Sequence, residues 1–269
     1  MTEPEINPEM NPEINPEINP DWSGYHTDKD QLRTDIWARL KQQGVSRRDP
    51  VGHIPYFIGA EQAAERLAAL PIWQQAQVIK CNPDSPQKPV RLRALQDGKL
   101  VYMAVPRLTH TRCFVELTAA DLNQRNIPLE DAATMRKALV YGRLVSFEEM
   151  QPIDLVIAGC VAATRNGGRI GKGAGYADLE LAILKTFGLL KPHTPIATTV
   201  HLLQIAEDSR LPMQPHDWPL DWIITPEEAI ATHTTHPQPA GLDWNMIRPD
   251  QYQKIPMLRT LWERPNPGL

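Results

Sequence analysis

The sequence feature that most constrains the fold is a glycine-rich segment, residues 167–178, which reads GGRIGKGAGYAD. An apolar run at residues 153–158 precedes it, and a helical pattern at residues 179–187 follows it. A strand, a glycine-rich turn and a helix in this order can form a phosphate cradle, because backbone N–H groups and the positive end of the helix dipole face the anion. The segment therefore predicts an α/β fold with an anion site at this turn.

Three alternating glycines and two cations are the candidate ligand-binding residues of this segment. Gly171, Gly173 and Gly175 lack Cβ atoms, so they can adopt positive φ and let the backbone approach an anion. Arg169 and Lys172 add positive charge. The pattern is neither GxxxxGK[ST] nor a well-placed GxGxxG. The alternative is a tight surface turn in which both cations are solvated.

A second pair of cations lies near the expected start of the ordered chain. Residues 27–43 show a helical pattern, with Thr27 as the expected N-cap and Gly44 as the stop. Lys29 and Arg33 fall on the apolar stripe of this helix rather than opposite it. Cations placed there reach back to solvent, pair with acids or enter a polar site. The helix dipole disfavours cations at this end, so an anionic ligand would help to explain the pair.

Strand-like and helical segments alternate along the rest of the chain. Further helices are predicted at residues 59–70, 90–96 and 131–141, and further strands at residues 76–81, 100–105, 196–200 and 222–225. This alternation predicts a three-layer α/β fold, with a mostly parallel, Rossmann-like sheet between two layers of helices. Ligands bind such sheets at the carboxyl ends of the strands, where the glycine segment, His201 and Thr225 are expected.

Proline-rich segments lie at both ends of the chain. Residues 1–22 hold an NPE[I/M] repeat, and a proline at every fourth position excludes a regular helix or a central strand. We expect a disordered acidic tail there and one domain over residues 23–269. The last part of the domain, about residues 232–269, is predicted to be an irregular arm with a short helix near residues 257–262.

Composition limits the class of function. A net charge of −4 argues against a general nucleic-acid surface. No apolar run approaches the roughly 18 residues of a membrane helix, and the N-terminus lacks the regions of a secretory signal, so a cytoplasmic protein is expected. Cys81, Cys113 and Cys160 are too far apart for a CxxC site and predict reduced, buried thiols. His233 and His236 predict a solvated turn, and no residue is assigned to a metal.

Residues 154–178 resemble the 5-formyltetrahydrofolate cyclo-ligase family, whose signature is a strand followed by G-x-R-L-G-x-G-x-G-Y-Y-D. Downstream, Gln204, Leu211, Pro212, His216, Asp217 and Thr225 are similar in type and spacing to the family's Q…LP…HD…VD…T segment. Lys29 and Arg33 are similar to its N-terminal K-x-x-x-R. The arm resembles a branch whose members hold a cyclo-ligase-like domain and in some cases an RNA-recognition module, but no RNP-type motif occurs in these residues.

This resemblance implies a fold of the NagB/RpiA/CoA-transferase type and an ATP- and Mg²⁺-dependent ligase that converts 5-formyltetrahydrofolate to 5,10-methenyltetrahydrofolate. The formyl oxygen takes the γ-phosphoryl group, and N10 then closes the ring. Arg169 and Lys172 would act in catalysis, and the implied cofactor-binding residues are Lys29, Arg33, Gly171, Gly173, Gly175, Tyr176 and Asp178. The implied partners are a reduced folate and ATP, with no nucleic acid or membrane, and the implied assembly is a monomer or homodimer.

Three positions depart from the family pattern. Thr164 stands where the family has an acid that it uses near Mg²⁺, and Ala177 replaces the second tyrosine of the signature. The family's Glu-Pro has no clear match near residues 146–152. The alternative function is therefore a paralogue that binds a nucleotide or phosphate ligand without the cyclo-ligase reaction; the resemblance links such branches to thiamin metabolism.

Deletion of residues 1–22 is expected to leave the melting temperature and any ATP affinity nearly unchanged, because the proline repeat cannot contribute a regular element to the core. A thermal melt and an ATP titration of the truncated protein check this. A drop of several degrees would instead mean that Ile14, Ile18 or Trp22 docks on the domain.

Overall fold

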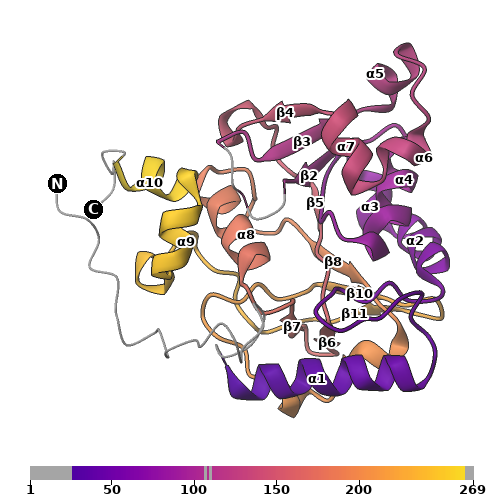
Figure 1. Cartoon of the computed structure of the whole chain (residues 1–269), viewed down its shortest axis with the longest axis vertical. Helices are drawn as coiled ribbons and strands as arrows, with labels where there is room; N and C mark the ends of the chain where they lie inside the picture. The colour runs from indigo at the N-terminus through magenta and orange to yellow at the C-terminus, as the bar shows by residue number, and fades with distance from the viewer. Residues whose placement is uncertain (1–25, 106–107, 109–110, 264–269) are drawn as a thin grey trace.

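The centre of the molecule is an eight-stranded sheet with the order β11-β10-β8-β5-β1-β2-β3-β4 (Figure 1). The computed structural model describes residues 26–105, 108 and 111–263, so the tail predicted at residues 1–22 lies outside the described residues. The strands are β1 (Val78–Cys81), β2 (Leu100–Ala104), β3 (Phe114–Leu117), β4 (Arg143–Val145), β5 (Leu155–Ile157), β8 (Ile196–Thr199), β10 (Trp222–Ile224) and β11 (Ala229–Ala231). Strands β10, β8, β5, β1 and β2 pair in parallel, whereas β11, β3 and β4 pair antiparallel at the edges. The predicted mostly parallel sheet is confirmed.

Helices cover both faces of this sheet. One face carries α2 (Ala60–Ala68), α3 (Pro71–Gln75), α4 (Lys88–Gln96), α5 (Ala119–Gln124), α6 (Leu129–Ala132) and α7 (Met135–Tyr141), and the other carries α8 (Tyr176–Thr186), α9 (Pro249–Lys254) and α10 (Pro256–Glu263) (Figure 1). Successive strand residues face opposite sides. On β2, Val101 and Met103 join the core with α2 and α4, while Tyr102 joins the core with α8. The sequence prediction of a three-layer α/β fold is confirmed.

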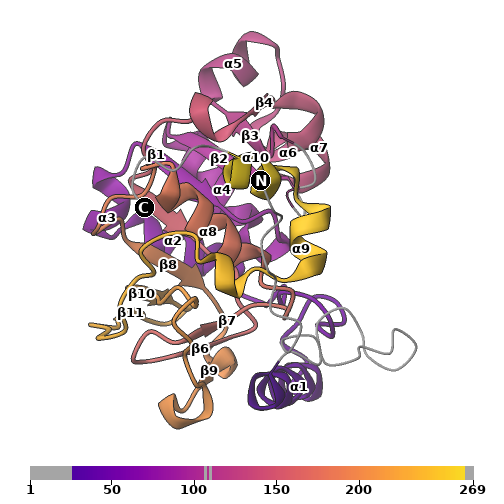
Figure 2. The same ribbon diagram turned by 90° about the vertical axis from the view of Figure 1, so that its left-hand side faces the viewer.

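A small second sheet connects the N-terminal helix to the domain. It has the order β7-β6-β9 and consists of β6 (Ala162–Thr164), β7 (Arg169–Ile170) and β9 (Ile205–Ala206). Helix α1 (Thr27–Gln42) packs beside it, as Figure 2 shows, and buries Ile36 and Trp37 against Val161 and Ile170. Strand β7 lies inside the glycine segment, residues 167–178, so the turn that leads into α8 follows β7 of this small sheet rather than the parallel strand β5; this corrects the simple strand–turn–helix prediction.

The predicted elements differ from the observed ones mainly at turns and edges. The helix predicted at residues 131–141 is two helices, α6 and α7, because Thr134 accepts the N–H of Lys137 and begins a new helix. Thr27 is the first helical residue rather than the N-cap, a position that His26 holds. Gly44 has φ of 64°, as its predicted role as the stop requires. Strands β3, β4 and β11 were not predicted, since runs of three or four residues give little periodicity.

The C-terminal arm is more regular than predicted. It contains α9, which the sequence did not indicate, and α10, which confirms the predicted short helix. Ile255, Met257 and Leu258 of the arm belong to the same buried cluster as Leu181 and Leu184 of α8. The arm is therefore part of the layer that covers the α8 face of the sheet.

The five 3₁₀ helices that the structure describes are short and lie in connections. They are η2 (Ser85–Gln87), η4 (Phe147–Glu149), η5 (Leu202–Gln204), η6 (Asp208–Arg210) and η7 (Trp244–Met246). No helix within the described ranges combines the length and apolar composition needed to span a membrane.

Candidate functional site

A cavity of about 190 Å³ lies where the glycine segment meets the carboxyl ends of β1 and β5. Asn82 and Asp84 follow β1 and Gly159 follows β5, so the cavity has the position expected for a ligand site in an open α/β sheet. Every residue predicted to bind the cofactor or to act in catalysis lines it, namely Lys29, Arg33, Arg169, Gly171, Lys172, Gly173, Gly175, Tyr176 and Asp178. The fold thus brings α1 and the glycine segment, far apart in sequence, to one site.

Two of the three alternating glycines have the backbone conformation that the sequence predicts. Gly173 has φ of 115° and Gly175 has φ of 71°, whereas Gly171 is not among the glycines with positive φ. Gly171 instead offers its carbonyl to Arg33 Nε at 2.8 Å. Gly175 is the N-cap of α8, and the first residues of that helix line the cavity. The N–H groups of the first turn of α8 and the positive end of its dipole therefore lie at the cavity wall.

Arg169 is a buried residue of the site and not a surface cation. Only 2% of it is exposed, and its guanidinium forms an ion pair with Asp178. Burial alone would lower the pKa of Arg169, but the neighbouring Asp178 outweighs it and raises that pKa. Lys172 is different, because its side chain is 45% exposed and its Nζ lies 3.0 Å from Asp84 Oδ1. The alternative of a solvated surface turn is wrong for Arg169 and partly right for Lys172.

The two cations of α1 point inward, as predicted, and both have acidic partners. Lys29 forms a buried ion pair with Asp217, and Arg33 pairs with Asp30. Asp217 Oδ2 also accepts the N–H of Gln214 at 2.7 Å, so this carboxylate both fixes a turn and neutralises Lys29. Burial lowers the pKa of Arg33, although Asp30 opposes that shift. Pairing with acids and facing a polar cavity, which the sequence left as alternatives, occur together.

The three carboxylates at the cavity wall do not form a cluster. Asp84, Asp178 and Asp217 each line the cavity, and each is paired with a different cation. Within the described ranges, no group of three or more His, Cys, Asp or Glu residues is arranged to hold a metal ion. A divalent cation at this site would thus depend on oxygen atoms that a bound ligand supplies in addition to these carboxylates.

Three residues expected at or near the site lie outside this cavity. Thr164 on β6 is fully buried, donates its hydroxyl hydrogen bond to Asn166 Oδ1 at 2.6 Å and is not among the residues that line the cavity. His201 Nδ1 accepts the N–H of Leu203 at 3.2 Å and caps η5. Thr225 Oγ1 accepts N–H groups of the following turn. All three have local structural roles.

The cysteines are inert thiols, as the sequence predicts. Cys81, Cys113 and Cys160 are buried and free. Burial raises the pKa of Cys81 to about 11, that of Cys113 to about 12 and that of Cys160 to about 11. Because the thiolate is the nucleophilic form, these side chains are unsuited to covalent catalysis at neutral pH.

Comparison with known proteins identifies the family. The sequence pattern of the 5-formyltetrahydrofolate cyclo-ligase family matches residues 25–226. The chain belongs to this family. It is 37% identical over 235 residues to a methenyltetrahydrofolate synthase domain-containing protein of Bos taurus, covering 87% of this chain and 61% of the relative. With the Homo sapiens protein of the same name it shares 35% identity over 238 residues, 88% of this chain and 62% of the relative. The chain thus spans about three-fifths of the length of these relatives.

Among solved structures, the chain is similar to the Aquifex aeolicus 5,10-methenyltetrahydrofolate synthetase. The TM-score is 0.48 and the identity is 17%, over 76% of this chain and 93% of that chain.

A second cavity, of about 510 Å³, adjoins the first. The two share Asn82, Asp84, Lys172, Ala174, Tyr176, Ala177 and Arg248. Arg248 belongs to the arm, beyond the residues that the family pattern matches, and its Nη2 donates to the Ala174 carbonyl at 3.0 Å. Arg248 was not predicted from the sequence, because a contact between residues 74 positions apart leaves no local pattern. Asn82 and Asp84 were not predicted either, although they follow β1 and ligands bind at the carboxyl ends of parallel strands.

Replacement of Gly173 by Val is expected to weaken ATP binding by roughly tenfold or more, since a hydrogen bond to a charged group contributes about 1.5–3 kcal/mol. The Cβ atom at positive φ also costs about 1–2 kcal/mol of stability. Gly98→Val is the matched control, because Gly98 has φ of 72° and lies between α4 and β2, away from the cavity. Titration calorimetry and circular dichroism check both variants. Equal ATP affinity in the two folded variants would contradict a phosphate cradle at Gly173.

Proposed function

We propose that this chain is an ATP- and Mg²⁺-dependent 5-formyltetrahydrofolate cyclo-ligase-like enzyme. The observation that supports this most is the convergence of Lys29, Arg33, Arg169 and Lys172 on a glycine segment that opens into the N-terminus of α8. Phosphoryl transfer requires positioning and neutralisation of charge more than a nucleophilic side chain. Preorganised cations and backbone N–H groups in a partly closed cavity meet that requirement.

The residues of the first cavity fit the phosphates of a nucleotide. Backbone N–H groups near Gly173 and Gly175 would bind them, and Arg169, held by Asp178, would provide a fixed positive charge. Lys172 would exchange its carboxylate partner Asp84 for phosphate at the lowest cost, since it is the most exposed cation of the group. In these positions, Arg169 and Lys172 would stabilise the charge that develops on the transferred phosphoryl group.

The carboxylates of the same cavity fit a phosphate-bound Mg²⁺. Asp84, Asp178 and Asp217 are hard oxygen donors of the kind this ion prefers, although each is now paired with a cation. When bound, Mg²⁺ would supply further neutralisation of the phosphate charge. Asp84 would be the most available of the three, because its partner Lys172 is half-exposed.

The larger cavity would hold the reduced folate. Tyr176, Ala177 and Lys172 border both cavities, so a group held at this boundary lies close to both bound molecules. Transfer of the γ-phosphoryl group to the formyl oxygen needs that proximity, and the side chains around the boundary would orient the two reactants and exclude water. Tyr176, the first residue of α8, contributes a half-buried ring at this place.

A second candidate function is a family paralogue that binds a nucleotide or phosphate ligand and does not form the methenyl product. The observation in its favour is that Ala177, which borders both cavities, stands where the family signature has its second tyrosine. Because Ala177 has only a methyl group, it provides no aromatic ring at the boundary between the two cavities. The other residues that line the larger cavity, which include Arg248 of the arm, would then determine the substrate specificity of such a paralogue.

An activity assay separates these two functions. The purified protein, supplied with ATP, Mg²⁺ and 5-formyltetrahydrofolate, is expected to form 5,10-methenyltetrahydrofolate, which is detected by its absorbance. Removal of Mg²⁺ with a chelator is expected to abolish turnover. A parallel thermal-shift screen with ATP, 5-formyltetrahydrofolate and thiamin phosphates reports binding without turnover. Stabilisation by ATP alone, with no methenyl product, would favour the paralogue.

The role of Lys29 is tested by a pair of variants. Lys29→Met removes the lysine partner of the buried Asp217 carboxylate, so we expect a loss of about 3–5 kcal/mol in unfolding free energy. The double variant with Asp217→Asn removes both charges and is expected to recover most of that loss. ATP affinity should stay roughly tenfold weaker in both, because the contact to phosphate is gone.

Chemical denaturation and ATP titration measure these two effects separately. Lys41→Ala serves as control, since Lys41 is an exposed cation of the same helix and pairs with Asp49 at the surface. If the double variant binds ATP as tightly as the wild type, Lys29 only neutralises Asp217 and does not contact the nucleotide.

A further inference from the structure

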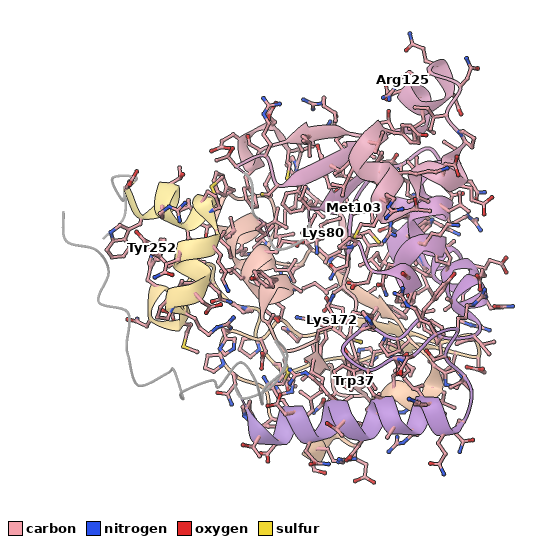
Figure 3. All side chains as sticks on the ribbon, in the orientation of Figure 1. Trp37, Lys80, Met103, Arg125, Lys172 and Tyr252 are labelled. Atoms are coloured by element: carbon pink, nitrogen blue, oxygen red, sulfur yellow. The ribbon has the colours of Figure 1, made fainter. Side chains whose placement is uncertain are left out.

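A buried ion pair crosses the interface between the central sheet and α8. Lys80 on β1 is fully buried, and its ammonium group contacts the carboxylate of Glu180 on α8. Lys80 also donates to Asn82 Oδ1. Lys80 shares the α8 side of β1 with Val78, because alternate strand residues face the same layer. Figure 3 labels Lys80 near the centre of the molecule, among the buried side chains.

A gain in folding stability does not by itself explain why Lys80 and Glu180 are buried as an ion pair. Two charges lose their hydration on burial, and apolar residues of similar volume are often as stable in such a place. Burial raises the pKa of Glu180, although Lys80 opposes the shift, so the site is costly for the carboxylate. Oε1 of Glu180 is the atom that contacts the Lys80 ammonium group, so this ion pair compensates for the burial of the carboxylate. A buried charge pair that apolar residues could replace calls for an explanation other than stability.

Glu180 lines a buried part of the wall of the 510 Å³ cavity. Only 6% of its side chain is exposed, whereas Met135 and Lys254, which line the same cavity, are 41% and 64% exposed. The exposed residues therefore mark the mouth of the cavity, and Glu180 belongs with the buried residues Ala104 and Leu108 to its floor. The volume lies within the range of about 300–1,000 Å³ that small-molecule sites occupy.

Helix α8 connects this floor to the phosphate site. Tyr176 and Glu180 are four residues apart and so lie on the same side of the helix, and both line the larger cavity. Tyr176 also lines the smaller cavity. A ligand that fills the larger cavity would therefore contact Glu180 at one end and the boundary with the phosphate site at the other.

We propose that Glu180 determines substrate specificity by accepting a hydrogen bond from an N–H group of an amino-substituted nitrogen heterocycle on the floor of the larger cavity. Lys80 is a positioning residue in this scheme, since it contacts Glu180 and is sealed from the cavity by burial. A carboxylate only accepts hydrogen bonds, so the ligand must donate. The inference rests on the proposed function, in which the heterocycle is the pterin-type ring of the reduced folate.

Two variants test this proposal by different routes. Glu180→Gln keeps the shape and removes the charge. The double variant Lys80→Met with Glu180→Leu replaces the ion pair by apolar residues, which are expected to keep the fold. Asp154→Asn is the matched control, because Asp154 is a carboxylate at the amino end of β5 that accepts backbone N–H groups of Gln77 and Val78.

Calorimetry of each variant uses four probes: 5-formyltetrahydrofolate, its ring-free fragment p-aminobenzoylglutamate, a free 2-aminopteridine and ATP. Both Glu180 variants are expected to bind the two ring-containing probes at least about tenfold more weakly than wild type. Affinity for the ring-free fragment and for ATP should stay within about twofold of wild type, as should all affinities of the control. A purely structural pair would change the melting temperature but not this ring-dependent pattern.

The outcomes separate this inference from the proposed function. Unchanged folate binding in the folded Glu180 variants would overturn the role of Glu180 while leaving the cyclo-ligase assignment in place. Binding of the free aminopteridine but not of 5-formyltetrahydrofolate, with dependence on Glu180, would support the inference and contradict the proposed substrate. If the wild type binds neither ring-containing probe, the inference is wrong.

Discussion

The buried ion pair between Arg169 and Asp178 holds the parts of the site in place. Arg169 is on β7, and Asp178 is in the first turn of α8. Asp178 Oδ1 also accepts the backbone N–H of Trp218 at 3.1 Å, and Arg169 Nε lies 3.4 Å from the Trp218 carbonyl. These contacts join the small sheet, the helix and the segment before β10. The glycine segment is thereby fixed at both ends, so its backbone can be preorganised for an anion.

Charge neutrality is the second constraint on this site. The cations Lys29, Arg169 and Lys172 each have a carboxylate partner at the cavity wall. Leaving the two buried cations, Lys29 and Arg169, without partners would cost several kcal/mol, which is a large part of the stability of a domain. An anionic ligand must therefore exchange with carboxylates rather than fill an empty positive pocket. The half-exposed pair of Lys172 and Asp84 is the place where exchange costs least.

Local patterns predicted much of the fold and most of the first cavity. Helical periodicity placed Lys29 and Arg33 on the inward face, and the glycine spacing marked the start of α8. Tertiary contacts were beyond such reasoning. The ion pair of Lys80 with Glu180 joins a strand to a helix 100 positions later, and a lysine in a short apolar strand gives no sign of its partner. Thr164 was assigned to the metal region by family position alone, and the hairpin β6–β7 buries it instead.

The arm contacts the glycine segment and also lines the larger cavity. Arg248 and Gln251 both donate to the Ala174 carbonyl, and a Cβ atom at Gly175 would lie 3.4 Å from each of their side chains. The glycine segment is thus confined between the arm on one side and Arg33, which binds the Gly171 carbonyl, on the other. Arg248 borders both cavities, so a shift of α9 would change the backbone of the cradle and the wall of the larger cavity together. Because the arm lies beyond the part of the chain that the family pattern matches, these contacts to the glycine segment and to the larger cavity come from residues outside that pattern.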